Sequence, residues 1–86
     1  MKWTLDHEAK LKSIIDSFID DEFILNSNYN DRLQVILGES IQAVYFITTL
    51  EDEFQFEFND EEIDIQFFMN YQVALGRIKS HFETEN

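Results

Sequence analysis

Residues 40–62 read SIQAVYFITTLEDEFQFEFNDEE, and the pattern of apolar residues in this stretch predicts a helix followed by a connector. Apolar residues recur in it at intervals of three and four, which is typical of a helix with one buried face. They are Ile41, Val44, Ile47, Leu50 and Phe54. A serine hydroxyl can accept a hydrogen bond from an unpaired backbone N–H at a helix start. The sequence therefore predicts a helix from Ser40 to about Glu53.

The second half of this stretch alternates Phe with polar residues over positions 54–58, the pattern of a strand. A lone strand has no pairing partner, and no second strand candidate is convincing. We interpret the segment as an extended connector whose Phe side chains fill the core. Asn59 is then expected to cap a short helix that ends near Ile65, with Glu62 completing a capping box.

Two more helices are predicted outside this stretch. The first runs from about Asp6 to Ile19, with Thr4 or Asp6 as its cap. The last follows Asn70, and close helix packing is the expected reason for Gly76 within it. Their apolar stripes are Leu11, Ile14, Ile15, Phe18 and Ile19 in the first helix, and Tyr71, Leu75, Ile78 and Phe82 in the last.

A connection of about twenty residues, 20–39, separates the first two helices. It contains the polar, turn-forming run NSNYNDR, and we expect a loop that packs its apolar residues over the core and can include a short turn of helix. Structureless connections of this length are uncommon in compact domains and are often functional. The predicted class is all-α: three main helices, one short helix and a long loop between the first two.

Composition narrows the possible functions. The chain has 86 residues, of which 44% are apolar, so it is expected to form one domain over 1–86. Its net charge of −12 excludes nucleic-acid binding and favours basic protein surfaces or cations as partners, although solubility alone would also explain it. There is no Cys, no apolar run approaching a membrane span, and no apolar core of a signal peptide. We expect a cytoplasmic, monomeric protein.

Residues 40–62 resemble the acyl carrier protein family over its second helix and the loop that follows. The family pattern is an Asp-Ser-Leu start, a Val four residues after the Ser, then Leu-Glu-x-Glu-Phe and an acidic run. The matching residues are Ser40, Ile41, Val44, Leu50, Glu51, Glu53, Phe54, Phe58, Asp60, Glu61 and Glu62, without a gap. This match covers about a quarter of the chain, and the helix order extends it loosely to the rest.

The resemblance implies a non-catalytic carrier. In the family, a separate transferase attaches 4′-phosphopantetheine from coenzyme A to the serine, which corresponds to Ser40 here. The product is a phosphoprotein whose arm carries acyl groups as thioesters, in pathways such as lipid or polyketide biosynthesis. Gly38 and Glu39 would form the approach to the arm. The implied partners are a phosphopantetheinyl transferase and acyl-loading or acyl-transferring enzymes with basic docking patches.

The chain also departs from the family pattern. Glu39 stands where Asp is usual, and the approach Ile36-Leu37-Gly38-Glu39-Ser40 is one residue shorter. The positions that usually carry acids near the serine are Gln42 and Tyr45. We therefore expect Tyr45 to be exposed and to belong to the docking surface. The expected partner-binding residues are Glu39, Ile41, Gln42, Tyr45, Glu51, Asp52 and Glu53.

Alternatives to a carrier remain open at this point. One is an adaptor that kept the fold without the arm, and another is an acidic module that sequesters a basic partner. No nucleophile–base pair is visible, so an enzyme is the least favoured class. His7 lacks the second His of a zinc HExxH helix, and His81 has no obvious partner, so both are expected at the surface. The acids alternating after residue 59 lack the Gly and final Glu of a calcium loop, and no metal site is predicted.

Overall fold

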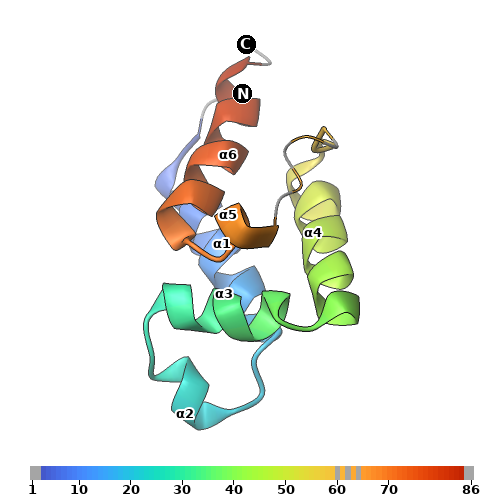
Figure 1. Ribbon diagram of the computed structural model, residues 1–86. Coiled ribbons are helices and arrows are strands. Elements are labelled where there is room, and N and C mark those ends of the chain that lie inside the picture. Colours follow the sequence, from blue (N-terminus) through green and yellow to red (C-terminus); the bar gives the residue numbers. More distant parts are fainter. Residues whose placement is uncertain (1–2, 60, 62, 64, 85–86) are drawn as a thin grey trace.

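The computed structural model describes residues 3–59, 61, 63 and 65–84, and it confirms the all-α class. The helices are α1 (Leu5–Ser17), α2 (Glu22–Leu25), α3 (Tyr29–Leu37), α4 (Ser40–Phe54), α5 (Ile65–Phe68) and α6 (Tyr71–Thr84). Figure 1 shows α4 standing beside α1 and α6, while α3 lies across the end of the bundle opposite the termini.

Within the described ranges, no single helix is long and apolar enough to cross a membrane. The helices α3 and α4 together have the length and composition of a span, but the chain bends by 117° between them.

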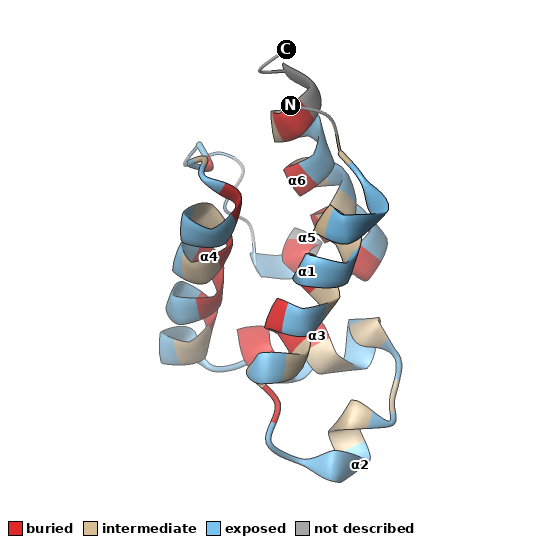
Figure 2. Cartoon of the chain, turned by 180° about the vertical axis from the view of Figure 1, so that it is seen from behind, coloured by how far each residue is buried: buried red, intermediate tan, exposed pale blue. Residues whose placement is uncertain are grey.

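One apolar core joins the long helices (Figure 2). Burying one aliphatic or aromatic side chain fully contributes about 1.5–3 kcal/mol. The fully buried large side chains come from α1, α3, α4, α5 and α6, and they are Leu11, Ile15, Leu33, Ile36, Phe46, Leu50, Phe68 and Ile78. The core therefore includes α3 together with the helices predicted from the sequence.

The prediction of a long loop over residues 20–39 is wrong, because this connection contains α2 and α3. The polar run that resembled a turn is instead a helix start: the Asn28 side chain accepts a hydrogen bond from the Asp31 backbone N–H at 2.9 Å. Leu33, Ile36 and Leu37 then form one buried face at intervals of three and four. Asparagine favours both turns and helix N-caps, and here tertiary burial selects the cap.

The start and length of α4 confirm the predicted helix, but its buried face is rotated from the predicted one. Ile41 and Val44 are 73% and 65% exposed. The buried residues of α4 are Ala43, Phe46, Ile47, Leu50 and Phe54. Two apolar stripes overlap on this helix, and the stripe that contains Ala43 and Phe46 faces the core.

As predicted, the segment after α4 forms neither helix nor strand over residues 56–59, but Phe54, the first residue of the predicted connector, still belongs to α4. Gln55 ends the helix with a left-handed backbone (φ 57°), and Phe54 and Phe58 are buried on either side of the half-buried Phe56. The Glu51 carboxylate accepts a hydrogen bond from the Phe58 backbone N–H at 2.9 Å. The predicted capping box and short helix after Asn59 rest on residues 60, 62 and 64, which lie outside the described ranges. A short helix, α5, begins at Ile65, where the predicted one was expected to end.

Both histidines pack against aromatic rings, which corrects the prediction that they are simple surface residues. His7 accepts a hydrogen bond from the Thr4 backbone N–H at 3.0 Å, so Thr4 is the cap of α1, and the His7 ring lies 4.5 Å from the Phe82 ring. The His81 ring lies 4.5 Å from the Phe56 ring and thus holds the extended connector against α6. Each imidazole supplies an apolar ring face that the sequence pattern did not reveal.

Side-chain hydrogen bonds fix α6 to the first half of the chain. The Tyr71 hydroxyl donates to Glu8 at 3.0 Å, and burial, together with this carboxylate, raises the pKa of Tyr71 well above its usual range. The Tyr71 backbone N–H donates to Asn30 at 2.7 Å, and the predicted cap Asn70 accepts from Val73 at 3.2 Å. Gly76 does not serve close packing, because no atom lies within 4 Å of the Cβ position.

Candidate functional site

The residue singled out by the sequence, Ser40, lies at the corner between α3 and α4 and is the first residue of α4. Gly38, Glu39, Ser40 and Ile41 are all exposed. In Figure 1 this corner lies at the end of α4 away from the two termini. A large protein can therefore reach the Ser40 hydroxyl without displacing a buried residue.

The corner is tight because backbone hydrogen bonds from both helices meet in it. The Gly38 N–H donates to the Gln34 carbonyl at 3.0 Å, and the Ala43 N–H donates to the Glu39 carbonyl at 2.8 Å. A Cβ on residue 38 would lie only 2.9 Å from the Gln34 carbonyl oxygen. Glycine thus relieves a crowded approach and keeps the space beside Ser40 open.

The electrostatics of the corner are mixed. The N-terminus of α4 carries a partial positive charge, and its first turn contains no acidic residue, so an anion attached at Ser40 would be favoured there. Glu39 occupies the N-cap position, but its side chain makes no capping hydrogen bond. Its exposed carboxylate is adjacent to Ser40 and would oppose that same anion.

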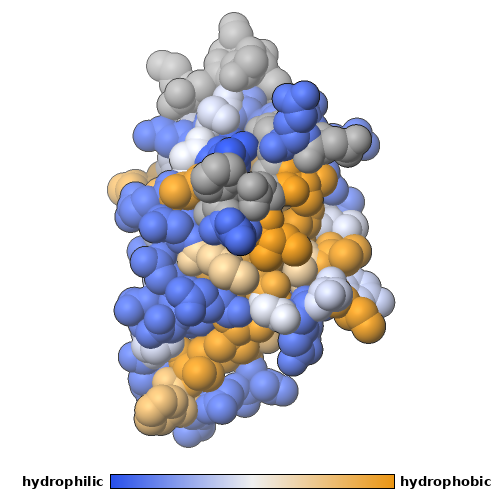
Figure 3. Space-filling model, in the orientation of Figure 1, coloured by the Kyte–Doolittle hydropathy of each residue, from blue (hydrophilic) through white to orange (hydrophobic). Residues whose placement is uncertain are grey.

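Three apolar side chains form an exposed patch beside Ser40, which we call the α4 outer face: Ile41, Val44 and Tyr45. Their spacing of three and four places them on one side of the helix. Tyr45 is 64% exposed, as predicted, whereas Gln42 is half-buried. Figure 3 shows hydrophobic surface on the flank of the molecule where α4 lies. Val44 was assigned to the core from the sequence, because the two overlapping stripes could not be told apart by spacing.

The three acids predicted to bind partners lie at the other end of α4, and they differ in their surroundings. Glu51 is half-buried and holds the Phe58 N–H. Glu53 pairs with Lys10 at 3.2 Å, and the same ammonium donates to the Glu53 carbonyl at 3.0 Å. Asp52 is exposed, about 18 Å along the helix axis from Ser40. Two of the three acids therefore support the fold.

A shallow hollow of about 430 Å³ lies at this acidic end. It is lined by Glu51, Asp52, Gln55, Phe56 and Glu57. Across the residues that the structure describes, no group of three or more acidic or histidine side chains is arranged to hold a metal ion. The hollow is open to solvent and three of its five lining residues are acidic, so no ligand is assigned to it.

Comparison with known proteins identifies no relative. No protein-family model matches the chain, and neither a curated protein nor a solved structure matches it.

Proposed function

We propose that this protein is a non-catalytic carrier that holds acyl groups as thioesters on a 4′-phosphopantetheine arm attached to Ser40. The observation that carries the proposal is the exposure of Ser40 as the first residue of α4. The acyl carrier resemblance requires a serine hydroxyl at this kind of junction. A core serine, or one in the middle of a helix, would have argued against attachment.

The residues around Ser40 fit such a group. Gly38 presents no side chain on the approach, and the unpaired N–H groups of the first turn of α4 would favour the phosphodiester. The arm would supply a terminal thiol that forms the thioester. The chain contains no Cys, so no protein thiol would compete for the acyl group.

The exposed side chains also support a choice of partner. The α4 outer face offers an apolar and aromatic contact beside the arm, and Asp52 offers a charge farther along the same helix. A partner enzyme would thus combine an apolar contact near the arm with basic residues about three turns away. Tyrosine suits this surface because its ring buries a large area at low entropy cost.

Intact mass spectrometry tests the attachment. The full chain is incubated with coenzyme A and a broad-specificity phosphopantetheinyl transferase, and we expect the mass to rise by one phosphopantetheine. Ser40→Ala should abolish the rise, because no other serine or threonine lies between Ser27 and Thr48. Ser13→Ala is the matched control, since Ser13 is also exposed on a helix, and it should be modified like the parent chain.

One observation favours a second function, that of an unmodified adaptor. The Glu39 carboxylate is adjacent to Ser40 and opposes an anionic phosphodiester. An unchanged mass with several transferases would reject the carrier proposal in favour of the adaptor. If Glu39→Gln restored modification in that case, charge repulsion at the corner would be the cause.

A further inference from the structure

A second feature, independent of Ser40, lies in the connection between α1 and α3. Residues 20–28, which we call the strap, contain α2 and project beyond α3 in Figure 1. No residue of the strap is buried; Ile24, Leu25 and Ser27 are half-buried, and Phe23 is 84% exposed. The strap therefore contacts the hydrophobic core only through the half-buried side chains of Ile24 and Leu25.

The hydrogen bonds inside the strap are mainly local. The Asp21 carboxylate caps α2 by accepting from the Phe23 N–H at 2.8 Å. The Leu25 and Asn26 N–H groups donate to the carbonyls of Asp21 and Glu22 at 3.0 and 3.2 Å. These bonds hold the short helix together, but they do not attach it to the rest of the molecule.

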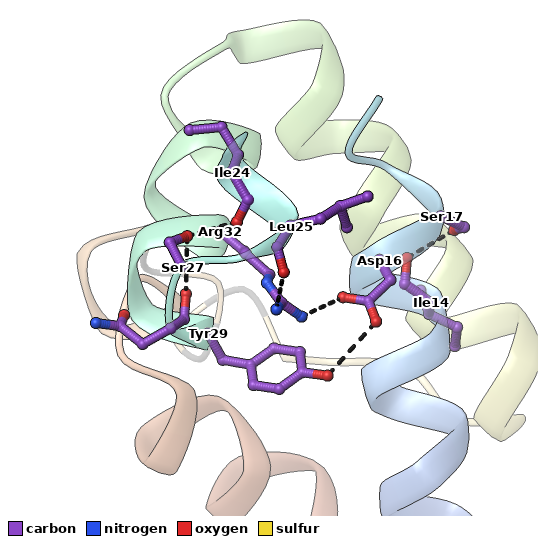
Figure 4. A network of polar contacts seen from close by, with 9 residues as sticks. Ile14, Asp16, Ser17, Ile24, Leu25, Ser27, Tyr29 and Arg32 are labelled. Atoms are coloured by element: carbon purple, nitrogen blue, oxygen red, sulfur yellow. Dashed lines mark hydrogen bonds and ion pairs between the residues drawn. The ribbon is translucent and has the colours of Figure 1, made fainter. Parts of the chain in front are cut away.

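Arg32 of α3 supplies the attachment (Figure 4). One guanidinium nitrogen, Nη1, pairs with Asp16 of α1 at 2.6 Å, and the other, Nη2, donates to the Leu25 carbonyl of the strap. The guanidinium also stacks over the Tyr29 ring at 4.3 Å, and the Tyr29 hydroxyl reaches Asp16 at 3.5 Å. One side chain thus joins the strap, α3 and α1.

Arg32 is stable in this position only while Asp16 and the Leu25 carbonyl remain bound to its guanidinium. The Arg32 side chain is only 12% exposed, and its Nε has no hydrogen-bond partner among the described residues. A desolvated guanidinium is costly unless its charge is paired. The remainder of α3 has its own anchor in Leu33, Ile36 and Leu37, so it does not depend on Arg32.

We propose that the strap is a separately opening unit, latched to the body of the protein by Arg32. Opening releases α2 while α1, α4 and α6 stay folded, because the fully buried side chains that join those helices all lie outside the strap. It also withdraws Ile24 and Leu25 from the core cluster they pack against. An apolar surface would then become available at the end of the molecule that carries Ser40 (Figure 1). This inference does not depend on whether Ser40 carries an arm.

Native-state hydrogen exchange of the full chain tests this latch. The reporters are the Leu25 and Asn26 amides of the strap, and the references are the Ala43 and Ala74 amides of α4 and α6, each bonded within its own helix start. In Arg32→Met we expect the strap amides to exchange at least about tenfold faster, while the reference amides keep their rates. Uniform acceleration of all four amides, or no change at the strap, would overturn the proposal.

Two further variants separate the latch from a general loss of charge. Arg32→Lys keeps the charge but loses the planar fork, so it cannot serve Asp16 and Leu25 together and should also speed strap exchange. Because Arg32→Lys is the milder substitution, strap exchange can be measured in it even if Arg32→Met does not fold. Lys10→Met removes a basic residue of α1 whose partner is Glu53, and strap exchange should match the parent chain. If Lys10→Met opened the strap as much as Arg32→Lys, the latch would be wrong.

Discussion

Tyr45 and Phe46 are neighbours in the chain, yet their surroundings are opposite. Tyr45 is 64% exposed on the α4 outer face, whereas Phe46 is fully buried and packs edge-to-face against Phe18 at 5.4 Å. We therefore expect Tyr45→Glu to change the free energy of unfolding by no more than about 0.5 kcal/mol. Phe46→Ala should cost about 3–5 kcal/mol, since it removes a buried ring and leaves a cavity. Urea unfolding of both variants measures the difference.

The same Tyr45 variant tests the proposed partner choice. If the α4 outer face contacts dedicated enzymes, Tyr45→Glu should lower the kcat/KM of those enzymes for this protein. It should raise the kcat/KM of generic carrier enzymes that have basic docking patches. Because the fold is expected to be unaffected, any change reports on docking. Unfolding of Tyr45→Glu would instead assign the residue to the core.

At the scale of helices, the two glycines of the chain are opposite cases. Gly76 lies exposed in α6, where a Cβ meets no atom within 4 Å, so Gly76→Ala should stabilise the protein by about 0.5–1 kcal/mol through helix propensity. At Gly38 the added Cβ would lie 2.9 Å from the Gln34 carbonyl oxygen, and Gly38→Ala should destabilise. Thermal unfolding of the two variants should move Tm in opposite directions. Equal Tm shifts in the two variants would mean that the close contact at Gly38 does not affect stability.

Helices with one clear apolar stripe were predictable from the sequence, and those with ambiguous signals were not. The cap of α6 at Asn70 was correct, because its side chain accepts a hydrogen bond from the Val73 N–H. The start of α4 at Ser40 was also correct, although Glu39 holds the N-cap position and no side chain caps this helix. The helix α3 was missed because Asn28 suits a turn as well as a cap. The α4 outer face was only partly predicted, since Ile41 and Val44 are as apolar as the residues that face the core.

Contacts between distant segments could not be predicted at all. The pairing of Arg32 with Asp16 joins residues of different helices, and no local pattern marks either of them. The ring contacts of His7 and His81 are of the same kind, because they depend on how α6 approaches α1 and the extended connector. Such contacts follow from tertiary packing, which fixes positions that spacing along the chain leaves open.

For the whole molecule, we expect self-repulsion from the net charge to be the main electrostatic effect on stability. The charge is −12, and the protein measures 39 × 27 × 19 Å. At 0.01 M salt the screening length is about 30 Å, so acids across most of the molecule repel one another, whereas at 0.15 M it falls to about 8 Å. We expect Tm to rise with sodium chloride, by about 4–8 °C for each 1 kcal/mol of repulsion removed.

Chloride is the right salt for this measurement, because sulfate would also stabilise through exclusion from the protein surface. Magnesium chloride at the same ionic strength serves as the comparison, and equal Tm values would assign the effect to screening alone. A Tm that falls as sodium chloride rises would mean that ion pairs such as Lys10–Glu53 outweigh the repulsion.

The ring of Trp3, before α1, meets the ring of Phe82, near the end of α6, edge-to-face at 5.1 Å. The first and last described segments of the chain therefore lie together, and Figure 1 shows the start of α4, at Ser40, at the opposite end of the molecule. If the protein is attached to a surface through either end of the chain, Ser40 and the strap lie on the side away from that surface. Immobilised or fused copies should accordingly keep both regions accessible, which makes binding to a sensor surface a practical assay format.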